Sequence, residues 1–513
     1  MRRSEFIRAA GLGGLGATLP RFVARGSSLA RGRERIAIVG AGIAGLVTAL
    51  RLADAGFAST IYESSSRVGG RMHSERQYWD EGQHTEWCGA MVDSTHLNIR
   101  GLARRFHLAL LDTHAARPPG ARDTCYLDGR YYPMSAADRD FAKIYPILKA
   151  QLARLPSNTT YKNANAMARQ LDAMSIRDWL ARYVPGGLDT QLGRLIAESY
   201  RNEYGREIDE LSAVNLVEQL GSQPDYAKNR QMNVLGYSNQ RYILARGSQA
   251  LPEAIAAALP PGSIRLGSAL AGLRRLRNGT YELRFARGAR VETVLADRVV
   301  LAIPFIVLRG LEYSGAGFDA PKVNAIENLG YGYHTKLHLQ FERRAWMRTP
   351  HPWPEPTTGQ IWTTYRIQSA LDYSLGQSGR DGLIEVFTAG APAMLDTPLA
   401  PYARIADSGA VERHVRGFFE QLDAIWPGVS PAWNGKATFG DAQADPNIRA
   451  SYSCWLVGQC TTIAGHEATR QGRVHFAGEH TSVAYQGFME GGAESGIRAS
   501  SEILSDYRIH AAA

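Results

Sequence analysis

Apolar residues near the start of the chain follow the spacing of a strand, a helix and a second strand. Residues 35–39 are a short apolar run that predicts a buried strand, and residues 58–62 predict another that ends at Glu63. Between them, residues 46–55 carry apolar positions at helical spacing and stop at Gly56, a residue type that commonly follows a helix end. This order predicts a β-α-β unit with parallel strands.

Helical spacing dominates the next part of the chain, from about residue 100 to residue 244. The clearest helical patterns are Leu171–Tyr183 and Leu188–Glu203, and a loop rich in proline, glycine and arginine (Ala115–Arg122) interrupts the stretch. We expect an inserted domain here.

Strand patterns return after this stretch. They are Ser263–Leu266, Thr280–Phe285, Arg298–Ile303, Tyr333–Phe341 and Arg473–Phe476. The fourth alternates strictly, which places Lys336, His338 and Gln340 on one face and apolar residues on the other. After the last strand, a helix rich in small residues opens within Gln486–Gly496.

Composition fits a protein of several domains. The chain has 513 residues, of which 44% are hydrophobic and 21% charged, so it can bury a large core and is neither disordered nor fibrous. No run of about 18 apolar residues occurs, so we expect no membrane-spanning helix.

The net charge of +9 does not indicate nucleic-acid binding. Residues 1–35 hold eight arginines and two glutamates, a net charge of +6, which leaves +3 for the rest of the chain. A nearly neutral body without a basic stripe predicts no nucleic-acid partner.

The four cysteines have no metal-ligand spacing, and we expect no metal site. A Cys454–Cys460 disulfide and four free thiols are both compatible with the sequence.

The first 34 residues resemble a twin-arginine export signal. Arg2 and Arg3 precede a mildly apolar, glycine-rich run from Ala9 to Leu19. This resemblance implies a leader over residues 1–34 and a periplasmic or secreted protein. The alternative is a cytoplasmic protein with a basic tail.

The β-α-β unit contains a dinucleotide-binding fingerprint, Gly40-Ala-Gly42-Ile43-Ala44-Gly45. Gly40 permits the tight turn, Gly42 lets the backbone approach a pyrophosphate, and Gly45 lets helix and strand pack closely. Glu63, 18 residues after Gly45, can accept hydrogen bonds from ribose hydroxyls. The fingerprint alone does not distinguish NAD from FAD.

Further motifs give the chain a resemblance to the flavin amine oxidases, which include monoamine and L-amino acid oxidases. These motifs are Gly69-Gly70-Arg71, Glu86–Met91, Ala477–Thr481 and Gln486–Gly496, and the similarity extends from about residue 34 to residue 508. The resemblance implies an α/β fold in which a Rossmann-like FAD-binding domain is interleaved with an α+β substrate-binding domain. The FAD domain would comprise residues 35–105, 245–312 and 440–513, and the substrate domain residues 106–244 and 313–439.

The resemblance also implies a set of residues that bind FAD. They are Gly40, Gly42, Ile43, Ala44, Gly45, Glu63, Gly70, Arg71, Gly89, Ala90, Met91, Val92, Leu270, Gly478, Glu479, Gly487, Phe488 and Met489. Ser451 stands where animal monoamine oxidases attach FAD through a cysteine, so we expect non-covalent FAD.

By the same resemblance, three residues serve the reaction, in which a hydride passes from the carbon next to nitrogen to flavin N5. Tyr452 and Phe488 would flank the substrate, and Lys336 would hold a water near the flavin and assist reoxidation by oxygen. The alternatives are core packing for Tyr452 and a solvated strand position for Lys336. For Trp455, which is near Tyr452 in sequence, core packing is the favoured interpretation.

The substrate expected from this resemblance is a primary or secondary amine without a carboxylate. Val92 and Phe387 stand where snake-type L-amino acid oxidases use an arginine and a tyrosine to hold that group. An L-amino acid oxidase with a different carboxylate contact, to which Arg246 could contribute, remains the close alternative. A desaturase and a non-catalytic electron-transfer flavoprotein are further ones. The sequence leaves open whether oxygen or a redox protein accepts the electrons, and whether the protein is a homodimer.

Overall fold

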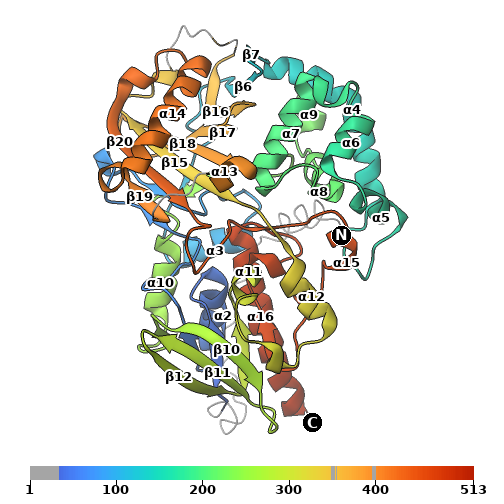
Figure 1. The fold of residues 1–513 in the computed structure, drawn as a ribbon, viewed down its shortest axis with the longest axis vertical. Coiled ribbons are helices and arrows are strands. Elements are labelled where there is room, and N and C mark those ends of the chain that lie inside the picture. Colours follow the sequence, from blue (N-terminus) through green and yellow to red (C-terminus); the bar gives the residue numbers. More distant parts are fainter. Residues whose placement is uncertain (1–33, 348–352, 354, 396–399, 513) are drawn as a thin grey trace.

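The computed structural model describes residues 34–347, 353, 355–395 and 400–512. The expected leader, apart from Glu34, lies outside the described residues. Figure 1 shows two lobes, and the lower one combines segments from the start, the middle and the end of the chain.

A five-stranded parallel sheet lies in the lower lobe and brings together strands that are far apart in sequence. Its order is β22-β13-β1-β2-β9, and all four pairings are parallel. The strands are β1 (Ile36–Val39), β2 (Thr60–Tyr62), β9 (Ile264–Arg265), β13 (Arg298–Leu301) and β22 (Val474–Phe476). Each of these five lies within a predicted strand, and the α/β fold class is confirmed.

Two helices with small residues pack closely against each other beside this sheet. They are α2 (Ile43–Asp54), which follows β1, and α16 (Met489–Ala512), which ends the chain (Figure 1). A Cβ atom at Gly496 of α16 would lie 2.5 Å from the carbonyl oxygen of Ala44 in α2. Glycine is therefore required at this helix contact.

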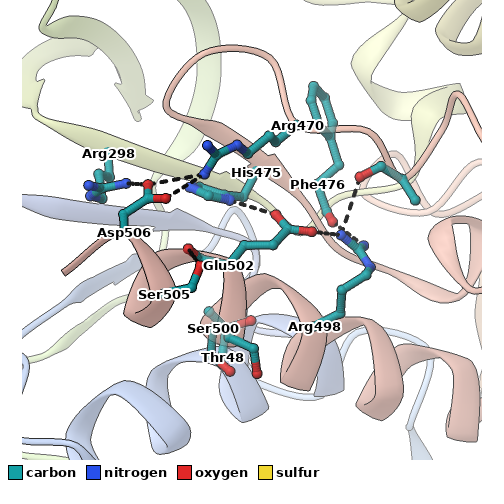
Figure 2. Close-up of polar contacts among 12 residues, drawn as sticks. Thr48, Arg298, Arg470, His475, Phe476, Arg498, Ser500, Glu502, Ser505 and Asp506 are labelled. Atoms are coloured by element: carbon teal, nitrogen blue, oxygen red, sulfur yellow. Dashed lines mark hydrogen bonds and ion pairs between the residues drawn. The ribbon is translucent and has the colours of Figure 1, made fainter. Parts of the chain in front are cut away.

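A network of ion pairs fastens the C-terminal half of α16 to the edge of the sheet, as Figure 2 shows. Glu502 accepts hydrogen bonds from His475 Nδ1 of β22 (2.7 Å) and from Arg498 (2.6 Å). One turn later, Asp506 accepts a hydrogen bond from Arg298 of β13 (2.6 Å). These contacts hold the C-terminal half of α16 against the sheet.

An antiparallel sheet of three strands also belongs to the lower lobe, and its hydrophobic core extends beyond the expected domain boundary. The strands are β10 (Ala269–Arg275), β11 (Tyr281–Arg287) and β12 (Arg290–Ala296), of which only β11 was predicted. Ala325 and Ile326 of α12 (Ala320–Asn328) share the core of this sheet. The expected boundary at residue 312 therefore falls inside one core.

The upper lobe is built on an eight-stranded sheet of order β19-β20-β15-β18-β17-β16-β6-β7. In chain order these strands are β6 (Arg122–Leu127), β7 (Arg130–Tyr131), β15 (His334–Phe341), β16 (Thr357–Thr363), β17 (Ser369–Asp372), β18 (Gly382–Ala389), β19 (Tyr402–Arg404) and β20 (Trp433–Asp441). Because β6 pairs with β16, strands that are more than 200 residues apart in sequence belong to one sheet.

The polar face predicted for β15 is buried. All eight residues of this strand are shielded from solvent, and α14 (Gly409–Ile425) packs against the apolar face. A solvated position for Lys336 is therefore wrong, since only 7% of the residue is exposed. The sequence predicted the alternation but not what covers the polar side.

Helices fill the other side of the upper lobe and share one core. They are α4 (Met134–Arg154), α5 (Ala166–Asp172), α6 (Ile176–Tyr183), α7 (Gln191–Tyr204), α8 (Ala213–Leu220) and α9 (Tyr226–Asn229). The single helix expected over Leu171–Tyr183 is two helices, because Ser175 caps the start of α6 through a reciprocal contact with Asp178.

Short elements connect these units. The helices are α3 (Leu97–Arg105), α10 (Ala250–Ala258), α11 (Phe305–Leu308), α13 (Ala391–Leu395) and α15 (Gln459–Thr462). The strands are β3 (Ser74–Glu75), β4 (Thr85–Glu86), β5 (Leu110–Asp112), β8 (Tyr242–Leu244), β14 (Gly330–Tyr331) and β21 (Ser453–Cys454). Within the described ranges, no helix combines the length and the apolar character that crossing a membrane requires.

Candidate active site

A cavity of about 300 Å³ lies where segments of both lobes meet. Its wall includes the turn before α2, the strands β15 and β18, the helices α7 and α8, and the segment that leads into α16. The predicted site residues on this wall are Gly40, Gly42, Ile43, Ala44, Glu63, Gly70, Arg71, Gly89, Ala90, Met91, Lys336, Tyr452, Gly478, Glu479, Gly487, Phe488 and Met489. The fold thus gathers residues that span the chain from 40 to 489 around one space.

Three predicted residues are not on the wall. Val92 is fully buried and exchanges backbone hydrogen bonds with Tyr242. Leu270 lies in β10 and packs into the core of the three-stranded sheet. Gly45 lies beneath the turn, where a Cβ atom would collide with the carbonyl oxygen of Gly40. The contact at Gly45 agrees with the close packing of helix and strand expected of it. The FAD contacts expected of Val92 and Leu270 stay predictions.

The turn before α2 leaves an open surface for a ligand. Gly40 has a φ angle of +102°, and a Cβ atom there would lie 2.6 Å from the carbonyl oxygen of Ala302. At Gly42, by contrast, a Cβ atom would meet nothing within 4 Å. No side chain caps α2, so backbone N–H groups at its start face the space beside Gly42. This arrangement fits a phosphate group.

Glu63 and Arg67 lie on the wall near this turn. Glu63 accepts hydrogen bonds from the backbone N–H of Ala41 (2.6 Å) and of Ser65 (2.9 Å), which orients its carboxylate. The Arg67 guanidinium donates to the carbonyl oxygen of Gly70 (2.9 Å) and brings a positive charge to the same region. Arg67 was not among the predicted site residues, although it lies two residues before the Gly69-Gly70-Arg71 motif.

Glu479, on the cavity wall, joins three separate segments of the chain. Its carboxylate forms an ion pair with Arg71 (2.9 Å) and accepts hydrogen bonds from Ser453 Oγ (2.7 Å) and from the N–H of Gly487 (2.8 Å). Burial alone would raise the pKa of Glu479, but Arg71 and the other donors outweigh it and hold the pKa below its usual range. The side chain is therefore an anion that fixes the loop before α16.

Aromatic rings form another part of the wall. The ring of His334 lies between Phe387, at 4.4 Å between centroids, and Tyr452, at 4.8 Å. Burial lowers the pKa of His334 to about 3, so the imidazole is neutral. Its Nε2 lies 2.7 Å from the carbonyl oxygen of Asn202, which can only accept, so Nε2 carries the proton. The stack presents an uncharged, largely apolar surface to the cavity.

Lys336 reaches the cavity as one member of a buried ion pair. Its Nζ donates to Glu385 Oε2 at 3.1 Å, and His338 Nε2 lies 3.1 Å from the same oxygen. Burial would raise the pKa of Glu385, but the Lys336 charge and the His338 contact outweigh it and keep the pKa below its ordinary value. Glu385 was not predicted, because residue 385 becomes the neighbour of β15 only through the pairing of β15 with β18.

The two remaining aromatic candidates are placed differently. Phe488 lies on the cavity wall, and its ring contacts the edge of His96 with 5.1 Å between centroids. Trp455 packs against the cores of both lobes and is not on the wall. This position agrees with core packing, the interpretation favoured for Trp455.

Helices α7 and α8 supply a polar part of the wall that the sequence did not identify. Gln219 Nε2 donates to Glu203 Oε1 at 2.9 Å, and Gln219 Oε1 accepts a hydrogen bond from Tyr204 at 2.6 Å. All three residues line the cavity. Glu203 is the last residue of a predicted helix. What its side chain contacts could not be predicted without the position of α8.

The cysteines are free thiols, and only Cys88 lies on the cavity wall among them. In the part of the chain that the structure describes, no group of three histidine, cysteine or acidic residues could hold a metal ion.

Comparisons with known proteins agree with this arrangement. The sequence profile of a family described as flavin containing amine oxidoreductase matches residues 43–504. Polyamine oxidase 1 of Oryza sativa subsp. japonica is 25% identical over 93% of this chain and 98% of its own length. An L-amino-acid oxidase of Siganus canaliculatus is 24% identical over 92% of this chain and 85% of its own length.

A solved structure shows the same fold. Cyclohexylamine oxidase from Brevibacterium oxydans IH-35A superimposes with a TM-score of 0.75 at 17% identity, over 93% of this chain and 99% of that one.

Proposed function

Because this chain belongs to the flavin-containing amine oxidoreductases and is therefore a flavin-dependent oxidoreductase acting on CH–NH2 donors, we propose that it binds FAD non-covalently and oxidises a primary or secondary amine. A bound flavin would supply a hydride acceptor for the carbon next to nitrogen, and the imine formed would hydrolyse to a carbonyl compound and ammonia or a smaller amine. Oxygen, reduced to hydrogen peroxide, is the proposed electron acceptor.

The open turn at Gly42 is the observation that supports FAD. The turn leaves space for a pyrophosphate, the start of α2 offers N–H groups, and Glu63 supplies carboxylate oxygens for ribose hydroxyls. The cavity continues from this turn to Lys336, so one elongated cofactor can occupy it.

Two observations support non-covalent binding. Residue 451 is a serine whose hydroxyl contacts the carbonyl oxygen of Gly332 and His334 Nδ1. Cys88 lies 3.7 Å from the Tyr402 hydroxyl, and burial raises the pKa of its thiol, so little reactive thiolate is present near neutral pH.

The walls suit a neutral amine as the reacting species. The His334 stack and Phe488 give the cavity an apolar wall, which disfavours an ammonium ion at the reacting end. A free amine has a lone pair on nitrogen and can release a hydride from the adjacent carbon. Tyr452 and Phe488 would orient it, and Lys336 would hold a water close to the flavin.

An L-amino acid oxidase is the second candidate, and Arg117 is the observation that favours it. Arg117 lines a small cavity of about 20 Å³ that shares Met91, Gln240 and Leu371 with the main one. The buried Nε of this guanidinium has no hydrogen-bond partner. A carboxylate that reached this cavity would find a cation.

One anaerobic experiment tests the proposal. Purified protein should absorb near ~450 nm, and an amine substrate should bleach this band without oxygen while its amino acid counterpart does not. Denaturation should release the flavin into the supernatant. Bleaching by the amino acid alone would favour the second candidate. A yellow protein that no amine or amino acid bleaches would support an electron-transfer flavoprotein, and a colourless one would contradict the proposal.

The leader belongs to the same proposal. We propose export through the twin-arginine route because that route carries folded, cofactor-loaded chains. Replacing Arg2 and Arg3 by lysine should then retain the protein inside the cell, and an unchanged distribution after fractionation would contradict export.

A further inference from the structure

Positive charge gathers on the three-stranded sheet of the lower lobe. Residues 269–296, which form β10, β11, β12 and their two hairpin turns, hold six arginines and two glutamates but no lysine or aspartate, a net charge of +4. The whole chain after residue 35 carries only +3, so the rest of it carries −1. All six arginines are exposed: Arg274, Arg275, Arg277, Arg284, Arg287 and Arg290.

The two acidic residues of the sheet neutralise only part of this charge. Glu282 pairs with Arg274 at 2.7 Å. Glu292 is shared by Arg287 at 3.4 Å and by Arg265 of β9 at 2.9 Å. The other four arginines of the sheet form no ion pair with any residue that the structure describes: Arg275, Arg277, Arg284 and Arg290.

Strand pairing also places like charges together. Arg287 of β11 stands directly opposite Arg290 of β12. Like charges at opposite positions destabilise a strand pair, and an anion close to both would reduce this cost. Glu312 lies beside β10 through a backbone bridge to Gly272, but one more carboxylate still leaves positive charge in excess. The sheet therefore favours an anionic partner.

The outer face of the same sheet exposes apolar side chains. Tyr281, Leu283 and Phe285 of β11 point into the core, so their neighbours along the strand lie on the outer face. Val291 and Leu295 of β12 belong to this outer face and are 65% and 42% exposed. Val291 is the most exposed large hydrophobic residue in the described ranges.

Arg284 places a positive charge beside these two apolar residues. It stands opposite Thr293, which lies between Val291 and Leu295 on the outer side of β12. A Cβ atom at Gly272 of β10 would lie 2.6 Å from the Arg284 guanidinium, so the arginine side chain extends over that strand. Figure 1 shows the sheet near the lower end of the molecule, at the opposite end from the upper lobe. The outer face is thus an apolar strip bordered by arginine.

An anionic lipid bilayer fits this face better than the other partners that carry charge. Lipid phosphates match arginine, which can donate two hydrogen bonds to one phosphate, and the bilayer interface accepts exposed apolar side chains. A second copy of the chain would bring arginine against arginine. A nucleic acid would find no exposed aromatic ring on the sheet for base stacking, because Tyr281 and Phe285 are buried.

We propose that the outer face of β10, β11 and β12 docks on an anionic lipid bilayer, with Arg284 and Arg290 against lipid phosphates and Val291 and Leu295 in the interface. This surface is separate from the cavity, because none of residues 269–296, all of which the structure describes, lines the cavity wall. Docking and the proposed amine oxidation can therefore fail independently of each other.

Vesicle sedimentation with the full chain tests this proposal. Wild-type protein should bind vesicles of equal parts phosphatidylglycerol and phosphatidylcholine, bind pure phosphatidylcholine more weakly, and be released by added salt. Arg284→Gln combined with Arg290→Gln should weaken binding to the anionic vesicles at least about tenfold, since each arginine near such a surface adds to the affinity.

The matched control removes two arginines from the upper lobe. Arg177→Gln combined with Arg182→Gln changes two exposed residues of α6 and gives the protein the same net charge. This variant should bind anionic vesicles within about twofold of the wild type. If the double variant in the sheet lacks the wild-type circular dichroism spectrum, Arg290→Gln alone takes its place, with Arg182→Gln as its control.

A third variant separates a bilayer from a nucleic acid. Val291→Ser combined with Leu295→Ser should weaken binding to anionic vesicles about fivefold or more, because both changes remove apolar surface that enters the interface. Vesicle binding that does not depend on these two residues overturns the proposal. Capture of a DNA duplex by the same arginines would then identify a nucleic acid as the partner.

The remaining outcomes are distinct. A loss of vesicle binding that is confined to the sheet variants supports the docking surface, whether or not the protein oxidises an amine. Equal binding by the arginine variant of the sheet and by the α6 control overturns the proposal, and the arginines of residues 1–33 would then account for the affinity. Equal binding of the wild type to anionic and neutral vesicles also overturns it.

Discussion

At the scale of single residues, the cavity is organised by carboxylates whose partners are distant in sequence. Glu479 fixes Arg71 and the loop before α16, and Glu385 fixes Lys336. In both pairs, nearby positive charge outweighs burial and holds the pKa of the carboxyl group below its ordinary value. The ion pairs therefore persist at neutral pH and give the cavity fixed charges.

Removing Glu385 should destabilise the protein, because Lys336 would remain buried without a counter-charge. We expect Glu385→Gln to lower the free energy of unfolding by about 3–5 kcal/mol, measured by denaturant titration. Lys336→Met combined with Glu385→Gln should recover part of this loss.

The matched control is the Lys436–Asp80 pair, which is more exposed. Asp80→Asn should change the free energy of unfolding by less than about 1 kcal/mol. Equal changes in the free energy of unfolding for the two substitutions would show that burial does not increase the contribution of the Lys336–Glu385 pair.

At the scale of elements, α16 connects the cavity to the edge of the parallel sheet. Its first residue, Met489, lies on the cavity wall, and its C-terminal half is held by the contacts of Glu502 and Asp506 (Figure 2). Gly496 allows its middle to touch α2. The contacts of α16 with the sheet therefore also fix where its first residue lies on the cavity wall.

Weakening the contacts of Glu502 should loosen this helix. Glu502→Gln removes the charge that faces His475 and Arg498 and should cost about 1–3 kcal/mol. Hydrogen exchange should quicken over residues 489–507 and remain unchanged in α14. Glu412→Gln, which breaks an exposed pair with Arg416 on α14, should shift stability by less than about 0.5 kcal/mol. Unchanged exchange in α16 after Glu502→Gln would contradict this role.

At the scale of the whole molecule, the two lobes bury several neutral histidines. Burial lowers the pKa of His334 and of His480 to about 3 and that of His84 to about 4. The unfolded chain binds protons at these sites below about pH 6.5, whereas the folded chain does not. Their contribution to stability is therefore fully present above pH 6.5 and is lost as the pH falls toward 3.

His480 offers a clean test of this pH dependence, because neither ring nitrogen has a hydrogen-bond partner and the ring packs against Phe305. In His480→Phe, the loss of stability between pH 6.5 and pH 4 should be smaller than in the wild type by about 1.4 kcal/mol per pH unit. Denaturant titrations at several pH values measure this difference. Parallel curves for the two proteins would show that His480 is already charged in the folded state.

Much of the architecture could be predicted from local patterns. The β-α-β unit, the strand at residues 334–341 and the start of α16 were expected because each depends on residues close in sequence. The strands β10 and β12 were missed because apolar and polar residues alternate only weakly along them. Both are edge strands of their sheet, and each can be recognised only once its pairing with β11 is known. The break between α5 and α6 was missed because a capping serine interrupts a continuous apolar pattern.

The sequence by itself determined the tight turn before α2 and the glycines that this turn needs, since steric limits on the backbone act locally. It also determined which residues could take part in the chemistry, among them Lys336, Tyr452 and Glu479. Only the tertiary structure decided that Glu385 accompanies Lys336 and that Glu203 meets Gln219. It likewise decided that Leu270 and Val92 pack into hydrophobic cores. The physical reason is that strand and helix periodicity fixes the direction of a side chain within its own element. What that side chain meets depends on contacts between elements that are separated by hundreds of residues.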